Sequence, residues 1–427
     1  MSSRSKRCRF ILTLVIGLSA GLSSTQSVRA EKHLDGDVCA VAARWLEPST
    51  GKVLDARHLF SRLSKKSVVL LGESHTVNEH HLWQAQTLSG LLAYKRNLAV
   101  GFEMFPRRTQ ETLDEWAKGV LSESSFLKKV GWNKVWGYDS DYYMPLFNIV
   151  RQNRLSMIAI NVDRKLISRV GREGWKAVPL AERKGLTDPS PASTAYRQVL
   201  AEIYELERHH GSSSVKLTDT DEGPKEDKSD AKTSLSKLME SEDFSRFVDA
   251  QLTWDRAMAE ALWKARKNEP DALITGILGR GHIEHRHGVP HQLADLGIKD
   301  VAVLLPVEVG KACENTPADI ADAIFLVDSK TEPEDTPEKP KLGILIEGAD
   351  NGIRIMNVLD GSIAQTAALA AGDIIVKAAG ITLKTNTDLI EVIRRQAPGT
   401  WLPLDIQRGD QKLEIIAKFP PRAETSP

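Results

Sequence analysis

Histidine and glutamate side chains recur directly after short apolar segments of this sequence. Glu73 and His75 follow one such segment in a Gly-Glu-Ser-His element, and Glu103 ends the next. His282 closes a Gly-Arg-Gly-His element that follows a later segment. Imidazole together with carboxylate suits a divalent transition metal such as zinc, manganese, iron or cobalt. The same groups also form a general acid/base pair in which a carboxylate orients a histidine, so two kinds of chemistry are open.

The apolar segments that carry these groups have the composition of buried strands. Each is a nearly continuous run of Val, Ile, Leu and Ala, which is typical of strands covered on both faces. The five segments are Val68–Leu71, Leu98–Phe102, Met157–Val162, Leu273–Leu278 and Val301–Val307, and helical patterns at Glu79–Ala93, Leu146–Val150 and Phe244–Ala265 separate them. Alternating strands and helices predict an α/β domain with a mainly parallel sheet, and a doubly wound sheet is preferred to an incomplete barrel.

A parallel sheet would bring the polar groups together. Ligands of open α/β sheets bind beyond the carboxyl ends of the strands. The predicted metal ligands are His75, His282, Glu73 and Glu103, which all lie at or just after the ends of strands. Asn161 lies at the end of the third strand. The alternative is a hydrogen-bonded polar network that only closes the edge of the sheet.

An aromatic cluster lies between the second and third predicted strands. It comprises Trp132, Trp136, Tyr138, Tyr142 and Tyr143. Large aromatic side chains beside a cleft could flank a flat ligand, and a tyrosinate can be an axial ligand of haem iron. An aromatic lid between helices is an equal alternative. His80 and His81 begin the helix after the first His/Glu element, and one of them is expected to line the cleft while the other faces solvent.

The N-terminus has the pattern of a secretory signal peptide. Basic residues precede an apolar run at Phe10–Leu18, and Val28-Arg29-Ala30 places small residues at the −3 and −1 positions of a cleavage site. The run is too short to cross a bilayer of roughly 30 Å. We therefore expect a signal peptide at 1–30, export to the periplasm or cell envelope, and no transmembrane segment.

Charge and cysteine content set further expectations. The chain has 57 Lys plus Arg and 57 Asp plus Glu, whereas a nucleic-acid-binding protein would show a basic excess. No nucleic-acid partner is expected. Cys39 and Cys313 remain after cleavage, and they would either pair in an oxidising compartment or stay isolated as buried thiols.

Two polar segments divide the mature chain. Residues 211–234 contain almost nothing apolar, so they cannot bury enough surface to offset their ordering entropy and are expected to form a disordered insertion. Residues 328–341 are rich in Pro, Glu, Lys and Thr and are expected to be a linker. The predicted domains are an α/β domain at 31–327 and a small β-rich domain at 342–420.

The segment 342–420 resembles a PDZ domain. Short strands flank two predicted helices at Ser362–Ala370 and Asn386–Ala397. The resemblance rests on Lys341-Leu342-Gly343-Ile344, Gly361-Ser362-Ile363-Ala364 and Leu369-Ala370-Ala371-Gly372-Asp373-Ile374-Ile375. It implies that Leu342, Gly343 and Ile344 bind the terminal carboxylate of a partner protein while that peptide extends the sheet. A PDZ fold with a blocked groove is the alternative.

The first domain resembles the ChaN-like haem-binding family. The resemblance runs from about Val68 to Val307 and rests on an ordered series of motifs. They are Gly72-Glu73-Ser74-His75, His80-His81 with Gln84, Gly101-Phe102-Glu103-Met104-Phe105, Trp132 with Trp136-Gly137, Tyr143 with Pro145, Ala159-Ile160-Asn161, and Gly281-His282 followed by Gly288-Val289-Pro290. One departure is Thr76, which stands where the family often has an acidic residue.

The resemblance implies haem binding at the cell envelope in iron acquisition, with tyrosine as the iron ligand. Tyr143 is the position carried over, with Tyr142 as the second candidate, and His80, His81 and Trp136 complete the implied haem site. Whether the chain forms a homodimer is left open.

A related pattern implies a different function. The family is similar to the Tiki/TraB and erythromycin-esterase-like proteins, and the paired Gly-x-x-His elements with Glu103 are similar to the Tiki metal site. The alternative is therefore a metal-dependent hydrolase, a peptidase or esterase, in which Glu73, His75, Glu103 and His282 hold a metal that activates water. Haem binding is preferred because the aromatic cluster follows the haem-family pattern. A scaffold that acts through its PDZ-like domain alone is a third interpretation.

Overall fold

The computed structural model describes residues 41–211, 236–311, 316–328 and 340–421. The predicted signal peptide, almost all of the predicted insertion, most of the predicted linker, and both Cys39 and Cys313 lie outside these ranges. The chain divides into two compact units at the junction of Ser329 and Lys330. Within the described ranges, no helix combines the length and the apolar character needed to cross a membrane.

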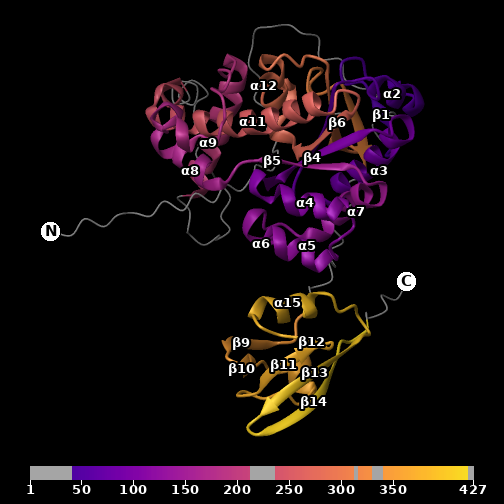
Figure 1. Cartoon of the computed structure of the whole chain (residues 1–427), viewed down its shortest axis with the longest axis vertical. Coiled ribbons are helices and arrows are strands. Elements are labelled where there is room, and N and C mark those ends of the chain that lie inside the picture. The colour runs from indigo at the N-terminus through magenta and orange to yellow at the C-terminus, as the bar shows by residue number, and fades with distance from the viewer. Residues whose placement is uncertain (1–40, 212–235, 312–315, 329–339, 422–427) are drawn as a thin grey trace, which may run out of the picture. The chain divides into compact units, whose positions relative to one another are not determined.

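The first unit is built on an eight-stranded sheet with the order β2-β1-β8-β7-β3-β6-β4-β5 (Figure 1). Its central strands are β3 (Val68–Glu73), β4 (Leu98–Pro106), β5 (Ser156–Asn161), β6 (Leu273–Gly279) and β7 (Val301–Glu308). Strand β3 pairs in parallel with β6 and β7, and β4 pairs in parallel with β6 and β5. The predicted mainly parallel sheet is confirmed, and each of the five strands begins within one residue of its predicted start.

Three further strands extend one edge of this sheet, and the sequence patterns did not indicate them. Strand β8 (Ala323–Val327) pairs in parallel with β7. Strand β1 (Trp45–Leu46) pairs antiparallel with both β8 and β2 (Val53–Leu54). A strand of two residues is too short to show an alternating pattern, which explains why β1 and β2 escaped prediction.

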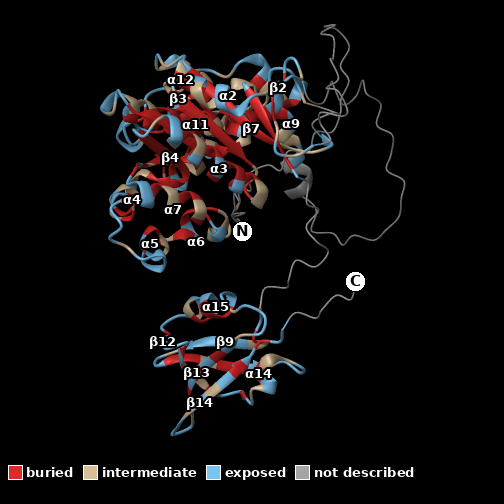
Figure 2. Cartoon of the chain, turned by 90° about the vertical axis from the view of Figure 1, so that its right-hand side faces the viewer, coloured by how far each residue is buried: buried red, intermediate tan, exposed pale blue. Residues whose placement is uncertain are grey.

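Helices cover both faces of the sheet, so the sheet is doubly wound. Along β3, Val69 and Leu71 pack into one apolar cluster, whereas Val68 and Leu70 pack into another. The first cluster is completed by α2 (Ala56–Leu63), α3 (Asn78–Tyr94), α4 (Gln110–Ala117), α5 (Glu123–Val130), α6 (Trp132–Val135) and α7 (Met144–Asn153), and the second by α8 (Arg164–Glu173), α11 (Glu242–Asn268) and α12 (Val289–Asp295). Figure 2 shows the strands buried between these layers. Helix α9 (Thr194–Gly211) packs beside α11 in a smaller cluster.

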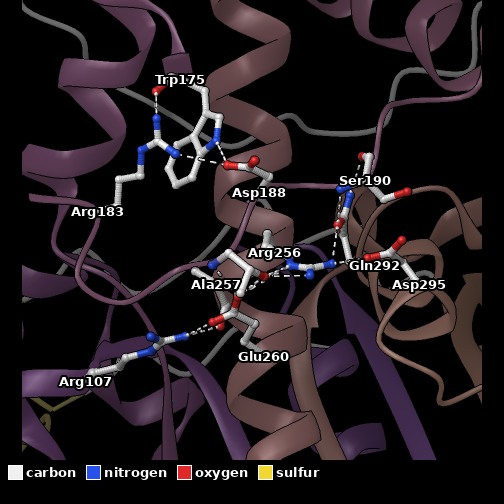
Figure 3. A network of polar contacts seen from close by, with 11 residues as sticks. Arg107, Trp175, Arg183, Asp188, Ser190, Arg256, Ala257, Glu260, Gln292 and Asp295 are labelled. Carbon is white, nitrogen blue, oxygen red and sulfur yellow. Dashed lines mark hydrogen bonds and ion pairs between the residues drawn. The ribbon is translucent and has the colours of Figure 1, made fainter. Parts of the chain in front are cut away.

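An arginine on α11 anchors the irregular segment that follows α8, in what we call the Arg256 network (Figure 3). The Arg256 guanidinium donates to the Thr187 hydroxyl at 2.6 and 2.9 Å and to Asp295 at 2.6 Å. Thr187 in turn donates its amide and hydroxyl to Glu260, at 2.8 and 2.6 Å. Arg256 and Glu260 are both almost completely buried. These charge-assisted bonds fix Thr187, which lies outside the two short 3₁₀ helices of this segment.

The second unit is an antiparallel sheet with the order β14-β13-β11-β10-β9, and β12 pairs with β11. Its strands are β9 (Ile344–Ala349), β10 (Gly352–Val358), β11 (Ile374–Ala378), β12 (Ile381–Thr382), β13 (Trp401–Arg408) and β14 (Gln411–Lys418). The predicted β-rich fold class of this unit is confirmed. Strand β9 lies at the edge of the sheet.

Two helices accompany this sheet. Helix α15 (Asn386–Arg394) begins with a capping box formed by Thr385 and Asp388. The helix predicted at Ser362–Ala370 was too long. The observed α14 (Ile363–Thr366) is a single turn, because Ala368 adopts a left-handed conformation with φ of 59° and ends it.

Candidate functional site

The structure brings four of the predicted site residues together at the carboxyl ends of β3, β4 and β6. These are Glu73, His75, Glu103 and His282, and none of their side chains is more than 5% exposed. Parallel strands produce this arrangement. Glu73 and His75 end or follow β3 and His282 follows β6, while Glu103 lies in the last part of β4. The result is a buried cluster of two imidazoles and two carboxylates, which we call the His/Glu cluster.

One imidazole of this cluster is held by a glutamate from the same turn. His75 Nδ1 lies 2.5 Å from Glu73 Oε1. The two side chains are two residues apart, and both are buried. Burial, the largest influence, lowers the pKa of His75, but the negative charges of Glu73 and Glu103 outweigh it, so the pKa is raised. His75 Nε2 has no hydrogen-bond partner.

The second imidazole is held by a residue that the sequence patterns did not identify. His282 Nδ1 lies 2.6 Å from Oδ1 of Asp255, which comes from α11. The Tyr196 hydroxyl donates to the other oxygen of Asp255 at 2.9 Å. Burial again lowers the pKa of the imidazole, and Glu103 and Asp255 together raise it above its usual value. Asp255 therefore orients His282 as Glu73 orients His75.

Glu103 lies between the two pairs. Its Oε2 accepts the amide hydrogen of Gly279 at 2.6 Å, while its Oε1 lies 3.5 Å from His282 Nε2 without a hydrogen bond. Asn161 donates to the main-chain carbonyl of Glu103 at 2.8 Å, which fixes the end of β4. Glu103 Oε1 and the Nε2 atoms of both imidazoles are thus buried and have no hydrogen-bond partner. Unpaired buried polar atoms are costly and rare, so they mark this cluster as a candidate functional site.

The two histidines at the start of α3 are both buried, so the expectation that one of them faces solvent was wrong. His80 Nδ1 accepts the amide hydrogen of Ser74 at 3.0 Å. Burial and the nearby Arg280 lower the pKa of His80 to about 3. This imidazole is therefore neutral and carries its proton on Nε2. His81 donates from Nε2 to the carbonyl oxygen of His75 at 3.2 Å.

The aromatic cluster packs directly against these imidazoles. The rings of Trp136 and Tyr138 lie 4.7 and 5.0 Å from the ring of His75. Tyr142 stacks on His81 with centroids 5.6 Å apart and planes 7° apart, and the ring of Tyr143 lies 4.4 Å from the same imidazole.

The two tyrosines proposed as haem ligands differ in exposure. Tyr143 is completely buried, and burial followed by the charge of Glu73 raises its pKa well above the usual value. Tyr142 is only half-buried. Without a metal ion, Tyr143 is therefore a neutral phenol.

The carboxylates of the His/Glu cluster pair with imidazoles. In the part of the chain that the structure describes, no group of three or more His, Cys, Asp or Glu side chains has an arrangement that could hold a metal ion. The arrangement that is present, an imidazole whose Nδ1 is held by a carboxylate, suits proton transfer at Nε2.

In the second unit, the predicted carboxylate-binding loop leads into the edge strand β9. Leu342 is buried in the apolar core. Gly343 adopts a left-handed conformation with φ of 79°, and a Cβ at this position would lie 2.3 Å from the Cβ of Ser362. Ile344 is the first residue of β9. The glycine is required because only it fits this close approach.

Comparison with known proteins identifies both units. The family model described as haem-binding uptake, Tiki superfamily, ChaN matches residues 59–293, and a PDZ domain model matches residues 340–418. A putative serine protease HhoB of Synechocystis sp. is 39% identical over 90 residues, which are 21% of this chain and 21% of that protein. The chain thus spans about a fifth of the length of this curated relative.

Solved structures with similar folds include ChaN of Campylobacter jejuni, whose structure is described as showing cofacial haem binding. It is 19% identical, covers 66% of this chain and 95% of its own, and has a TM-score of 0.49. The PDZ domain of HtrA3 bound to a phage-derived ligand is 26% identical, covers 18% of this chain and 82% of its own, and has a TM-score of 0.17. The resemblances found in the sequence are confirmed by the two family models. Residues 59–293 are more than half of the 427 in the chain, which therefore belongs to the haem-binding uptake family of the Tiki superfamily, ChaN.

Proposed function

We propose that this chain is an exported haem-binding protein that acts in iron acquisition at the cell envelope. Family membership supports the choice of ligand, and the sequence pattern at 1–30 supports export. The observation that carries the proposal is the stacked pair of Tyr142 and His81 at the edge of the aromatic cluster. It combines a partly exposed phenol, which is a known kind of axial ligand for haem iron, with flat apolar surface.

The structure favours Tyr142 over Tyr143 as the iron ligand. Tyr143 is completely buried, so haem iron could reach its hydroxyl only if the surrounding side chains moved. Tyr142 is half-buried and is the last residue of a short 3₁₀ turn at Ser140–Tyr142. In this proposal His80, His81 and Trp136 form a rigid layer behind the haem ligand rather than direct iron contacts, because all three are buried.

Absorption titration of the mature chain with haem tests this proposal. We expect a saturable shift of the Soret band, lost or displaced in Tyr142→Phe and retained in the matched variant Tyr143→Phe. Loss of the shift only in Tyr143→Phe would assign the ligand to the buried tyrosine. Absence of a saturable shift in the wild-type chain would refute haem binding.

A hydrolase is the second candidate, favoured by the unpaired Nε2 atoms of His75 and His282. Metal-assisted hydrolysis requires both imidazoles to turn their free nitrogens to one ion. Elemental analysis of the purified chain, together with cleavage of an aryl ester and of unstructured peptides, decides this. The hydrolase would be favoured if the wild-type chain contained stoichiometric transition metal and cleaved a substrate. His75→Ala should then lose both the metal and the activity, whereas the exposed control His58→Ala should keep both. Metal-free protein without cleavage activity would exclude it.

We also propose that the PDZ unit binds the C-terminus of a partner protein along β9. This strand ends the sheet, and Leu345 on it is 57% exposed. An added peptide strand would satisfy the free edge. Fluorescence polarisation with C-terminal peptides tests the proposal, and the same peptides with an amidated terminus are the control. Equal binding of both forms would show that Leu342, Gly343 and Ile344 do not recognise a carboxylate.

A further inference from the structure

A cavity of the first unit lies beside the His/Glu cluster but is not part of it. Its volume is about 610 Å³, which is in the range of small-molecule sites. It opens beyond the ends of β4 and β5, where Pro106 and Asn161 line it, and it extends along the start of α8. The carboxyl ends of parallel strands are the usual place for ligands in a doubly wound sheet.

The lining of this cavity carries a large excess of positive charge. Six cations and two acids line it, which leaves a surplus of four positive charges. Both acids already have partners, because Asp163 pairs with Arg108 at 2.6 Å and Glu182 pairs with Arg169. The other four cations are Lys134, Arg164, Lys165 and Lys184, and none of them has an ion pair among the described residues. Such a concentration of unpaired cations favours a negatively charged ligand.

The start of α8 adds to this preference. Asp163 is the N-cap residue of this ten-residue helix, but its side chain caps no backbone amide and instead accepts from Arg108. The first amides of α8 and the positive end of the helix dipole are therefore not neutralised by the usual capping carboxylate. Helix N-termini of this kind bind anions.

Two tryptophans give the cavity an apolar wall. Trp136 and Trp254 both line it, and both are more than nine-tenths buried. The indole N–H of Trp254 is buried and has no hydrogen-bond partner, and the same side chain also lines a neighbouring pocket beside α8 and α11.

The same tryptophans separate the cavity from the His/Glu cluster. The ring of Trp136 lies 4.7 Å from that of His75, and the ring of Trp254 lies 5.1 Å from that of His282. A ligand in the cavity would therefore lie one ring away from each imidazole of the cluster.

We propose that this cavity binds a small organic anion. Its carboxylate or phosphate group lies at the start of α8 among Arg164, Lys165 and Lys184, and its aromatic or aliphatic body lies against Trp136 and Trp254. Tyr142 does not line the cavity, although the cavity shares Trp136 with the proposed haem site, so anion binding is tested without haem.

Two matched fluorescent probes test the proposal on the full chain. Anilinonaphthalene sulfonate is an aromatic anion, and N-phenyl-1-naphthylamine is its neutral counterpart. We expect the sulfonate to bind saturably and at least about tenfold more tightly than the neutral probe, because a charge-assisted hydrogen bond commonly contributes that much. Added salt should weaken sulfonate binding, because it screens exposed charges. Equal affinity for the two probes would show only an apolar surface and would overturn the proposal.

Variants then locate the site. Arg164→Gln and Lys184→Gln should each weaken sulfonate binding about tenfold, whereas Lys176→Gln should change it less than twofold. Lys176 is exposed and lies outside the cavity lining, although it follows the same helix. Trp254→Phe should weaken binding several-fold, because it removes the indole N–H and part of the apolar wall, and its melting temperature should fall because a smaller ring leaves a cavity in the core. Identical affinity in the three charge variants would refute the assignment.

Competition distinguishes the two anion classes. Displacement of the sulfonate by inorganic phosphate but not by benzoate assigns a phosphate ligand, and the reverse assigns a carboxylate. A third outcome would contradict a discrete anion site. In that outcome neither anion displaces the sulfonate, although Arg164→Gln weakens sulfonate binding.

Discussion

The substitution Gly288→Ala tests whether the His282–Asp255 pair requires close backbone packing. Gly288 begins α12 and lies against this pair. A Cβ at this position would lie 2.5 Å from the carbonyl oxygen of His282 and 2.9 Å from Asp255 Oδ1. Neither distance is possible for a carbon atom, so the backbone or Asp255 must move. Asp255 cannot move without lengthening its 2.6 Å contact with His282.

The expected cost follows from this crowding. Overpacking by one methyl group typically costs about 1–3 kcal/mol. At about 2–4 °C for each kcal/mol in a domain of this size, the melting temperature should fall by roughly 2–12 °C. If Asp255 instead separates from His282, a buried charge loses its partner and the cost approaches about 3–5 kcal/mol. Thermal unfolding followed by tryptophan fluorescence is a suitable assay, because Trp254 lies beside His282.

Gly281→Ala is the matched control. Gly281 belongs to the element that carries His282, but a Cβ there would meet nothing within 4 Å. Its melting temperature should stay close to that of the wild type. If Gly288→Ala were as stable as wild type, or if both alanine variants lost equal stability, close packing at Gly288 would not be what holds Asp255 against His282.

Two further predictions concern charged contacts. Arg256→Met should lower the free energy of unfolding by about 3 kcal/mol, because it leaves buried partners in the Arg256 network unpaired. Urea denaturation measures this change. An unchanged midpoint of the urea transition would show that the network contributes no net stability. Asp373 lies in the PDZ unit and accepts from Arg408 at 2.7 and 2.8 Å. Burial alone would raise the pKa of Asp373, but the hydrogen bonds from Arg408 and a backbone amide lower it. The contribution of this carboxylate to stability is therefore complete above its unfolded pKa of about 3.9 and is lost as the pH falls through the lower folded value. Calorimetry of the full chain between pH 7 and 2 should show an acid-induced loss that is smaller in Asp373→Asn, and equal losses in both would contradict the pairing.

The sequence was sufficient to predict the centre of the first unit. Runs of Val, Ile and Leu located the five central strands, because a strand buried on both faces has few other possible compositions. The convergence of His75, Glu103 and His282 followed from the geometry of parallel strands rather than from any motif.

Other parts of the site had no local signal. Asp255 lies on a helix, 27 residues from the histidine that it holds, and its neighbours form an ordinary helical pattern. A usable indication in the sequence was that Asp255 and Glu260 lie among apolar residues of one helical segment, since charged residues inside a buried helix need partners elsewhere. The burial of Tyr143 and of both His80 and His81 depends on helices α3 and α7 packing together, which spacing along the chain does not reveal.

Adjacent residues of α11 serve two separate purposes. Asp255 holds His282, and Arg256 anchors the segment after α8. One residue corresponds to about 100° of rotation in a helix with 3.6 residues per turn. A single inserted or deleted residue just before Asp255 would therefore turn both side chains away from their partners at once. During evolution this helix can accept substitutions on its surface, but its length up to Asp255 is constrained, so homologues that keep both contacts should show no insertions or deletions in this part of α11.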